Sequence, residues 1–258
     1  DRSRGLGDVY KRQSDDEIIR IAVKSMGLDE LKPFVTAEKV IEDMVAPQGG
    51  NRLIDMTCKG FALETASESP APGGGSISAY MGALAAALGT MVANLSSHKP
   101  GWDERWEEFS NRAEEGQGYL KTLLALVDED TAAFNRIMDA FKLPKGTDEE
   151  KSARSAAIQD ATLYATEVPL RTMKAAFEVF PLVKAMAETG NPNSVSDAGV
   201  GALAARSAVL GAYLNVKINA AGLKDRQKAD AILAEAADIA AKAEAAEKET
   251  LAIVESKI

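Results

Sequence analysis

Cysteine and histidine are almost absent from this sequence. Its 258 residues include one cysteine, Cys58, and one histidine, His98. A single cysteine excludes a disulfide framework within the chain and is typical of proteins from a reducing compartment, so we expect a cytoplasmic location. Cysteine and histidine side chains also cannot supply the three or four ligands of an ordinary zinc site.

Aromatic residues and concentrated positive charge are scarce too. Aromatics make up 5% of the chain, and 30 Lys and Arg residues stand against 39 Asp and Glu residues, for a net charge of -9. A nucleic-acid partner is therefore not expected, because the chain has no dense basic run. Alanine is abundant, whereas clusters of Val, Ile and Tyr are few, which favours helices over sheets.

The stretch Pro70–Lys99 organises the chain. Gly73, Gly74 and Gly75 open it, and Ser76 is predicted to be the N-cap of a long helix. Small residues then recur four apart, as at Ala79 and Ala83, so other helices or a ligand can approach the backbone closely. We interpret this stretch as a buried central helix that is entered through a backbone-rich loop.

The run Ile77–Leu95 is nearly long enough to cross a membrane. It contains several Gly, Ser, Thr and Asn residues and little Leu, Ile or Phe, so we interpret it as a core helix and expect no membrane span. No secretory signal is visible.

The chain divides into three parts by pattern. Residues 1–13 have no capping or periodic pattern, and DVYKRQ within them resembles the translation of a common sequencing adapter, so they are predicted to be a non-native leader. Residues 14–54 are interpreted as a helical connector and residues 55–258 as one helical domain. The natural chain is then expected to extend further at its N-terminus.

Helical periodicity covers most of the chain, and no convincing strand pattern appears. Capping boxes are predicted at Ser14/Glu17 and Thr147/Glu150. Helices are expected over Leu53–Ser67, Asp103–Phe141, Thr147–Phe180 with a kink or break at Pro169, Asp197–Ala220, and from Asp225 to the C-terminus. The predicted architecture is an all-α multi-helix bundle around a long buried central helix.

Asp130 is the acid most suggestive of chemistry. It follows Val127 by three residues and precedes Phe134 by four, so it falls on the apolar stripe of its helix. A carboxylate that faces a core is costly unless it is paired or functional. In the alternative interpretation, Thr131 fills the stripe and Asp130 leans to its edge.

Several polar residues are candidates for ligand binding. The loop Gly73–Gly75 offers backbone N–H groups to an anion or a flat ligand, although it matches neither a P-loop nor a dinucleotide fingerprint and is equally interpreted as a tight turn. Asn215 and Asn219 share one helix face and are expected to bond either a neighbouring backbone or a ligand. Ser196 and Asp197 are interpreted as helix caps, an assignment that leaves room for a second role at a pocket mouth.

Five motifs together resemble one known family. They are APGGGS, LVDEDTAAF, KLPKGTDEE, GNPNSVSDAGVGALAA and GAYLNVKIN, and they occur in the order and spacing of the cyclodeaminase domain of formiminotransferase-cyclodeaminases. Methenyltetrahydrofolate cyclohydrolases are related to this domain. The similarity runs from about Asp55 to the C-terminus, while IIRIAVKSMGLDELKPFVTAEKVIEDMV resembles the end of a formiminotransferase domain.

The resemblance implies a dimerising all-helical enzyme of histidine degradation and one-carbon metabolism. It would convert 5-formiminotetrahydrofolate to 5,10-methenyltetrahydrofolate and ammonia, without a metal or redox cofactor. Asp130 aligns with the second acid of the family's LVDxDxxAF-like motif and is the expected catalytic residue. Gly73, Gly74, Gly75, Ser76, Ser196, Asp197, Asn215 and Asn219 are the expected substrate-binding residues. Lys99 or Lys145 is a candidate for attracting a polyglutamate tail.

Two other functions stay open at this point. The same pocket and acid suit a methenyltetrahydrofolate cyclohydrolase, which opens the ring with water. The chain also fits a non-catalytic helical dimerisation module for a transferase domain.

Overall fold

The computed structural model describes residues 13, 15–30, 32–41 and 52–258. Within these ranges every regular element is helical, which confirms the prediction of an all-α fold. The α-helices are α2 (Asp15–Ser25), α3 (Thr36–Lys39), α5 (Cys58–Thr65), α6 (Gly74–Ser97), α7 (Trp106–Lys142), α8 (Asp148–Phe177), α9 (Phe180–Thr189), α10 (Val195–Ala220) and α11 (Arg226–Glu255), and the 3-10 turns are η1 (Leu53–Asp55), η2 (Asp103–Arg105) and η3 (Pro192–Ser194).

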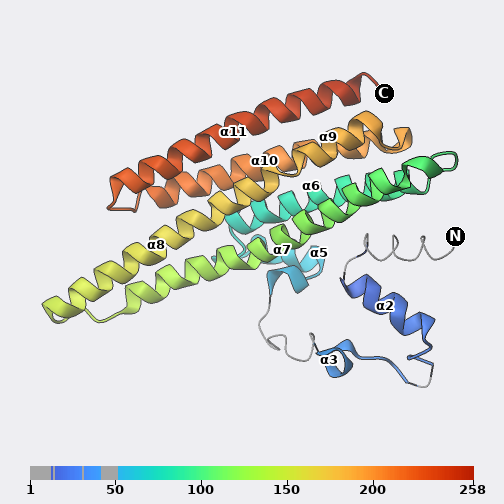
Figure 1. Ribbon diagram of the computed structural model, residues 1–258. Helices are drawn as coiled ribbons and strands as arrows, with labels where there is room; N and C mark the ends of the chain where they lie inside the picture. The colour runs from blue at the N-terminus through green and yellow to red at the C-terminus, as the bar shows by residue number, and fades with distance from the viewer. Residues whose placement is uncertain (1–12, 14, 31, 42–51) are drawn as a thin grey trace.

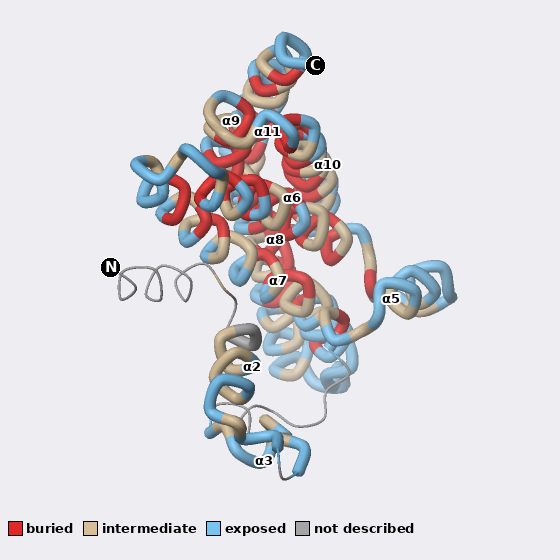
Figure 2. Tube along the Cα trace, turned by 90° about the vertical axis from the view of Figure 1, so that its right-hand side faces the viewer, coloured by how far each residue is buried: buried red, intermediate tan, exposed pale blue. Residues whose placement is uncertain are grey.

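Helix α6 lies at the centre of a bundle of long helices (Figures 1 and 2). It packs most extensively against α7 and α10, and it also contacts α8 and α9. Helix α11 packs on α10, while α7 and α8 form a long hairpin whose tip projects beyond the other helices (Figure 1). The red interior in Figure 2 follows α6 and α10, whose buried residues are mostly alanine and glycine.

Small residues on α6 let three helices meet at one point. A Cβ atom on Gly82 would lie 3.0 Å from Leu123, 3.3 Å from Ala176 and 3.4 Å from Ala208. Those three residues belong to α7, α8 and α10, so the missing side chain is what brings these helices close to α6. The interpretation of Pro70–Lys99 as a buried central helix is therefore confirmed.

In the part of the chain that the structure describes, two segments are long and apolar enough to cross a membrane, namely Gly74–Ser97 and Pro192–Ala220. In their most apolar windows, 61% and 44% of the residues are buried against other parts of the bundle. Length and hydropathy alone do not distinguish a membrane span from a core helix. The burial of these two segments against other helices is what a core helix shows.

Two predicted helices differ from the observed ones. The helix expected over Leu53–Ser67 is interrupted, because Thr57 has an extended backbone and its side chain accepts a hydrogen bond from the N–H of Gly60, which starts α5. Of the kink or break expected at Pro169, the break is absent. Helix α8 continues through this buried proline to Phe177, and Pro181 then lies in the first turn of α9.

Other terminal signals are confirmed. The Thr147/Glu150 capping box starts α8, Asp225 caps α11, and His98 follows the last residue of α6. The capping box predicted at Ser14 lies outside the described residues. Within the connector, α2 ends just before Gly27, whose φ of 65° needs the freedom of glycine.

An exposed apolar face runs along α6 and α10, which lie side by side. On α6 it includes Leu84, Met91 and Leu95, and on α10 it includes Val200, Leu203, Leu214 and Ile218, which are 38–72% exposed. Successive members are three, four, seven or eleven residues apart, so on each helix they lie on one side. We call these seven residues the α6/α10 face.

The close approach of α7 to α6 predicts opposite effects for two glycines on α7. A Cβ atom on Gly116 would lie 2.1 Å from the Thr90 hydroxyl oxygen and 2.9 Å from Leu182, whereas one on Gly118 meets nothing within 4 Å. We expect Gly116→Ala to lower the free energy of unfolding by about 1–3 kcal/mol through overpacking. Gly118→Ala should raise it by about 0.5–1 kcal/mol, because alanine favours helix.

Urea unfolding of the two variants and the parent chain measures both changes. The variants differ only in position along one helix, so each serves as the control for the other. Changes of the same sign in both variants would contradict the packing of α7 on α6.

Candidate active site

A pocket of about 210 Å³ gathers most of the predicted site residues. The N-terminal end of α6, the middle of α7, and parts of α8 and α10 form its walls. Its lining includes Gly73, Gly74, Gly75, Asp130, Asn215 and Asn219, together with Pro70, Ala71, Thr131, Ala133, Phe134, Ile137 and Ala165. Six residues that were predicted from three motifs, far apart in the sequence, thus meet at one site.

Ser76 lies behind this pocket and holds Asp130. The Ser76 hydroxyl is within hydrogen-bond distance of both the Val127 carbonyl oxygen, at 2.9 Å, and Asp130 Oδ2, at 3.1 Å. Ser76 is therefore not the N-cap, and that prediction was wrong. Gly73 takes the N-cap position with an extended backbone, which frees the serine side chain to reach α7.

Gly75 allows the carboxylate to approach the start of α6. A Cβ atom at this position would lie 2.0 Å from Asp130 Oδ1 and 2.6 Å from Asp130 Oδ2. Only glycine therefore fits beside Asp130. The start of a helix favours negative charge, because its first N–H groups have no partner within the helix. The anion at this glycine loop is thus the protein's own carboxylate.

Two opposing effects set the protonation of Asp130. Burial raises the pKa of its carboxyl group above the ordinary value, and hydrogen bonds from the Ser76 side chain and backbone act against this rise. Burial is the larger effect. A carboxyl group with a raised pKa suits proton transfer better than an ordinary surface acid, because it accepts and returns a proton closer to neutral pH.

The acids next to Asp130 have other partners. Asp128 Oδ1 accepts a hydrogen bond of 2.6 Å from the N–H of Leu53, which anchors η1 on α7. Glu129 bonds Arg171 and Tyr164 on α8, and the hydrogen bond from Arg171 holds the pKa of Glu129 below its usual range. Only Asp130 of these three acids lines the pocket, as helical periodicity had indicated.

The two asparagines bond backbone groups and also line the pocket. Asn219 Nδ2 donates a hydrogen bond of 2.6 Å to the carbonyl oxygen of Ala165 on α8. Asn215 Nδ2 donates one of 3.0 Å to the carbonyl oxygen of Gly211 in its own helix. Asn215 also lies close to Gly74, where an added Cβ atom would be 3.4 Å from Asn215 Nδ2. Both amides are thereby oriented beside the glycine loop.

Ser196 and Asp197 lie near the opposite end of α10. The N-cap of this helix is Ser194, so the prediction that Ser196 and Asp197 cap it was wrong, and both lie in its first turn. Asp197 and Asn215 are 18 positions apart in one helix, which corresponds to roughly 27 Å. Within one chain they do not share the pocket, and their role in substrate binding stays a prediction.

Sequence reasoning missed part of the apolar wall. Phe134 and Ile137 follow Asp130 by four and seven residues, so helical spacing already placed them on its face. Ala165 carried no such signal, because only the packing of α8 against α7 and α10 brings it to the pocket.

Comparison with known proteins places this geometry in a family. The sequence profile of the formiminotransferase-cyclodeaminase family matches residues 57–238. The chain belongs to this family. The matched residues include every residue that lines the pocket, so the site lies entirely within the family domain.

Named relatives fall into two groups. A methenyltetrahydrofolate cyclohydrolase from Methylorubrum extorquens is 41% identical over 81% of this chain and 99% of its own length. The formimidoyltransferase-cyclodeaminase of Mus musculus is 35% identical over 82% of this chain, but the match covers only 39% of that longer protein. This chain therefore spans nearly the whole of the first relative and about two fifths of the second.

A solved structure supports the same assignment. The crystal structure of a formiminotetrahydrofolate cyclodeaminase from Thermotoga maritima superposes with a TM-score of 0.69 and 26% identity, and the match covers 78% of this chain and 96% of that one. The family's helical domain thus corresponds to the bundle that contains the pocket.

The raised pKa of Asp130 predicts that Asp130→Asn stabilises the fold at neutral pH. Native Asp130 binds its proton more tightly than the unfolded chain does, so its contribution to stability is present below the unfolded pKa of about 3.9 and is lost as pH rises through the native pKa. An asparagine at this position does not ionise, so its contribution to stability does not fall as pH rises. Urea unfolding from pH 7 down to pH 4 should show an advantage for Asp130→Asn that shrinks as pH falls, and an advantage that grows instead would contradict the burial of this carboxylate.

Proposed function

We propose that this chain is a formiminotetrahydrofolate cyclodeaminase with Asp130 as its catalytic residue. The observation that carries the proposal is one partly buried carboxylate, held by Ser76 against Gly75 in a pocket that the family's motifs surround. The family and the names of its members support a folate substrate. The proposed enzyme needs no metal or redox cofactor and belongs to cytoplasmic one-carbon metabolism.

Asp130 would move one proton during cyclisation. Folate N10 attacks the formimino carbon, which forms the N10–carbon bond, and N10 must then lose its proton. The exocyclic amine leaves as ammonia once it is protonated, so one carboxylate that takes the first proton and delivers it to the amine closes the cycle. As an anion, Asp130 also stabilises the positive charge that substrate and product share.

The pocket suits one end of a folate. A cavity of about 210 Å³ is smaller than the 300–1,000 Å³ that usually encloses a drug-sized ligand. Phe134 and Ile137 offer an apolar wall to a flat ring, while the loop Gly73–Gly75, Asn215 and Asn219 offer polar atoms to its edge. The rest of the folate would extend out of this pocket.

A methenyltetrahydrofolate cyclohydrolase is the second candidate. It is favoured by the 41% identity to a cyclohydrolase that this chain matches over 99% of its length. In that reaction water attacks the methenyl carbon while the same carboxylate takes a proton from the water. One of the two bonds from this carbon to nitrogen then breaks, the released nitrogen takes a proton, and the carbon stays on the other nitrogen as a formyl group. A non-catalytic dimerisation module gives no reason for a carboxylate in an open pocket.

A transferase partner and a second copy of the chain are part of the proposal. The bifunctional relatives are longer than this chain, which supports a formiminotransferase domain ahead of residue 55 in the natural protein and a role in histidine degradation. The α6/α10 face supports a homodimer, because soluble proteins rarely leave such a stripe uncovered. Leu214 and Ile218 on this face adjoin Asn215 and Asn219, so a second copy would cover the pocket rim.

Asp130→Asn and Asp128→Asn make a matched pair that tests catalysis. We expect Asp130→Asn to lower kcat by roughly 10²–10⁴-fold, the usual effect of removing a general acid–base group. Asp128→Asn removes the same charge two residues away and keeps an oxygen that accepts from Leu53, so its kcat should stay within about threefold of the parent value. The assay follows methenyl-folate absorbance and ammonia release from 5-formiminotetrahydrofolate.

Parallel assays separate the candidate functions. Joint appearance of methenyl-folate and ammonia supports cyclodeamination, whereas hydrolysis of added methenyl-folate without ammonia formation from the formimino substrate supports the cyclohydrolase. Full activity in Asp130→Asn would refute the catalytic assignment. If the folded chain catalyses neither reaction, the structural module is the better interpretation.

The α6/α10 face predicts a variant that separates the dimer. Leu84→Lys combined with Leu203→Lys places two charges on this face, where the native side chains are 45% exposed in one chain. Sedimentation at micromolar concentration should show the parent chain as a dimer and this double variant as a monomer with reduced turnover. Leu143→Lys is the control, since Leu143 is 41% exposed in the turn between α7 and α8, at the tip that projects beyond the other helices (Figure 1). A fully active monomer would refute the dimer requirement.

A further inference from the structure

The hydroxyl group of Ser76 has one proton and two acceptors within reach. Its oxygen lies 2.9 Å from the Val127 carbonyl oxygen and 3.1 Å from Asp130 Oδ2. Both contacts lie within hydrogen-bond distance, but a hydroxyl group has only one proton to donate. Ser76 can therefore donate a full hydrogen bond to the backbone of α7 or to the carboxylate, but not to both.

Solvent does not reach the Ser76 side chain, because this residue is fully buried. A third neighbour is the Thr131 hydroxyl, whose oxygen lies 3.4 Å from the Ser76 oxygen and can donate to it. Thr131 itself lines the pocket. Protein atoms therefore set the direction in which the Ser76 hydroxyl points, and that direction depends on which acceptor is the stronger.

The strength of the two acceptors changes with the protonation of Asp130. The Val127 carbonyl oxygen lies inside α7, where it also accepts the N–H of Thr131 four residues on, so it keeps one partner when Ser76 turns away. A hydrogen bond to a carboxylate is about twice as strong as one to a neutral acceptor. Ionisation of Asp130 should therefore draw the Ser76 proton to the carboxylate, and protonation of Asp130 should return it to Val127.

Among the described residues that line the pocket, Asp130 alone has an ionisable side chain. Helix α6 and the loop before it contribute glycines, α8 contributes an alanine, and α10 contributes two asparagines. On α7 itself, Asp128 bonds the N–H of Leu53 and Glu129 bonds Arg171. The groups that stabilise the ionised carboxylate, and so oppose the rise of its pKa on burial, are the hydroxyl and the N–H of Ser76.

We propose that Ser76 is a positioning residue whose hydroxyl hydrogen bond alternates between Asp130 and Val127 as Asp130 loses and gains the transferred proton. When Asp130 takes the proton of N10, the N10–H bond breaks, an O–H bond forms on the carboxyl group, and the Ser76 hydroxyl turns to the Val127 carbonyl. When the proton passes to the leaving amine, the carboxylate forms again and the hydroxyl turns back. Ser76 keeps its own proton throughout. The role in turnover rests on the proposed function, whereas the exchange is a property of the folded chain.

A pH titration followed by NMR tests the exchange without any turnover. The full chain is labelled with ¹³C at the Asp130 carboxyl carbon and at the Val127 carbonyl carbon. In the parent chain both signals should change with one midpoint, because the Val127 carbonyl gains a hydrogen bond as Asp130 gains its proton. In Ser76→Ala the Asp130 midpoint should move to higher pH, because the ionised form loses its donor, and the Val127 signal should lose most of its response.

Ser78→Ala is the matched control. Ser78 is also buried on α6, two residues further on, and its hydroxyl donates 2.6 Å to the Gly74 carbonyl oxygen within the same helix. This variant should titrate as the parent chain does. An Asp130 midpoint that stays in place or falls in Ser76→Ala would overturn the proposal, as would a Val127 signal in the parent chain that responds no more than the carbonyl of Leu126.

Steady-state kinetics link the exchange to the reaction. In whichever folate reaction is observed, Ser76→Ala should lower kcat about tenfold at pH 7 and move the acidic limb of its pH profile to higher pH. A purely structural defect would lower kcat by the same factor at every pH. The expected NMR shifts without either activity would refute the proposed function and leave the exchange standing, whereas activity with an unmoved acidic limb would refute the role of Ser76 alone.

Discussion

The Asp130 carboxylate occupies the space that a side chain at position 75 would fill. This contact fixes three features together. It requires glycine at the start of α6, it sets how closely α7 approaches α6, and it places a partly buried acid against unpaired helix N–H groups. Ser76 completes the arrangement by holding both the carboxylate and the Val127 carbonyl oxygen. The fold and the site therefore depend on the same few atoms.

Helix α6 serves packing and chemistry by the same means, which is the lack of large side chains. Near its middle, Gly82 lets α7, α8 and α10 meet, and at its start Gly75 admits Asp130. Its outward side carries the larger apolar residues of the α6/α10 face. A substitution on the inner side thus alters the bundle or the pocket, whereas one on the outer side alters what the chain can associate with.

Sequence pattern alone predicted much of this molecule, because a helix leaves a periodic pattern of apolar residues within a single segment of sequence. The all-α class, the central helix, the capping box at Thr147 and the start of α11 follow from spacing within single segments. Asp130 followed from its place on an apolar stripe, and the family resemblance followed from five motifs in order. The errors were also local: Ser76 has the chemistry of an N-cap, and Thr57 divides what looked like one helix.

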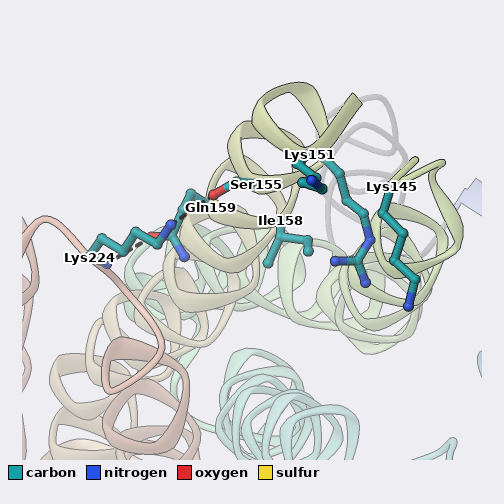
Figure 3. A pocket seen from close by; sticks show the side chains of 7 residues that line it. Lys145, Lys151, Ser155, Ile158, Gln159 and Lys224 are labelled. Atoms are coloured by element: carbon teal, nitrogen blue, oxygen red, sulfur yellow. Dashed lines mark hydrogen bonds between the residues drawn. The ribbon is translucent and has the colours of Figure 1, made fainter. Parts of the chain in front are cut away.

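Tertiary structure decided which of these separate signals meet. It brought Asn215 and Asn219 to the glycine loop and left Ser196 and Asp197 at the other end of the same helix, although all four occur in strong motifs. It also assembled a second cavity from α8 and the turns at residues 143–147 and 221–225, and sequence had singled out only Lys145 among the residues that line it (Figure 3). The sequence by itself determined most of the helices, the caps of α8 and α11 and the place of Asp130 on an apolar stripe, since these depend on neighbours within a few residues. Only the packing of helices decided the active-site pocket, since its walls come from residues up to about 150 positions apart.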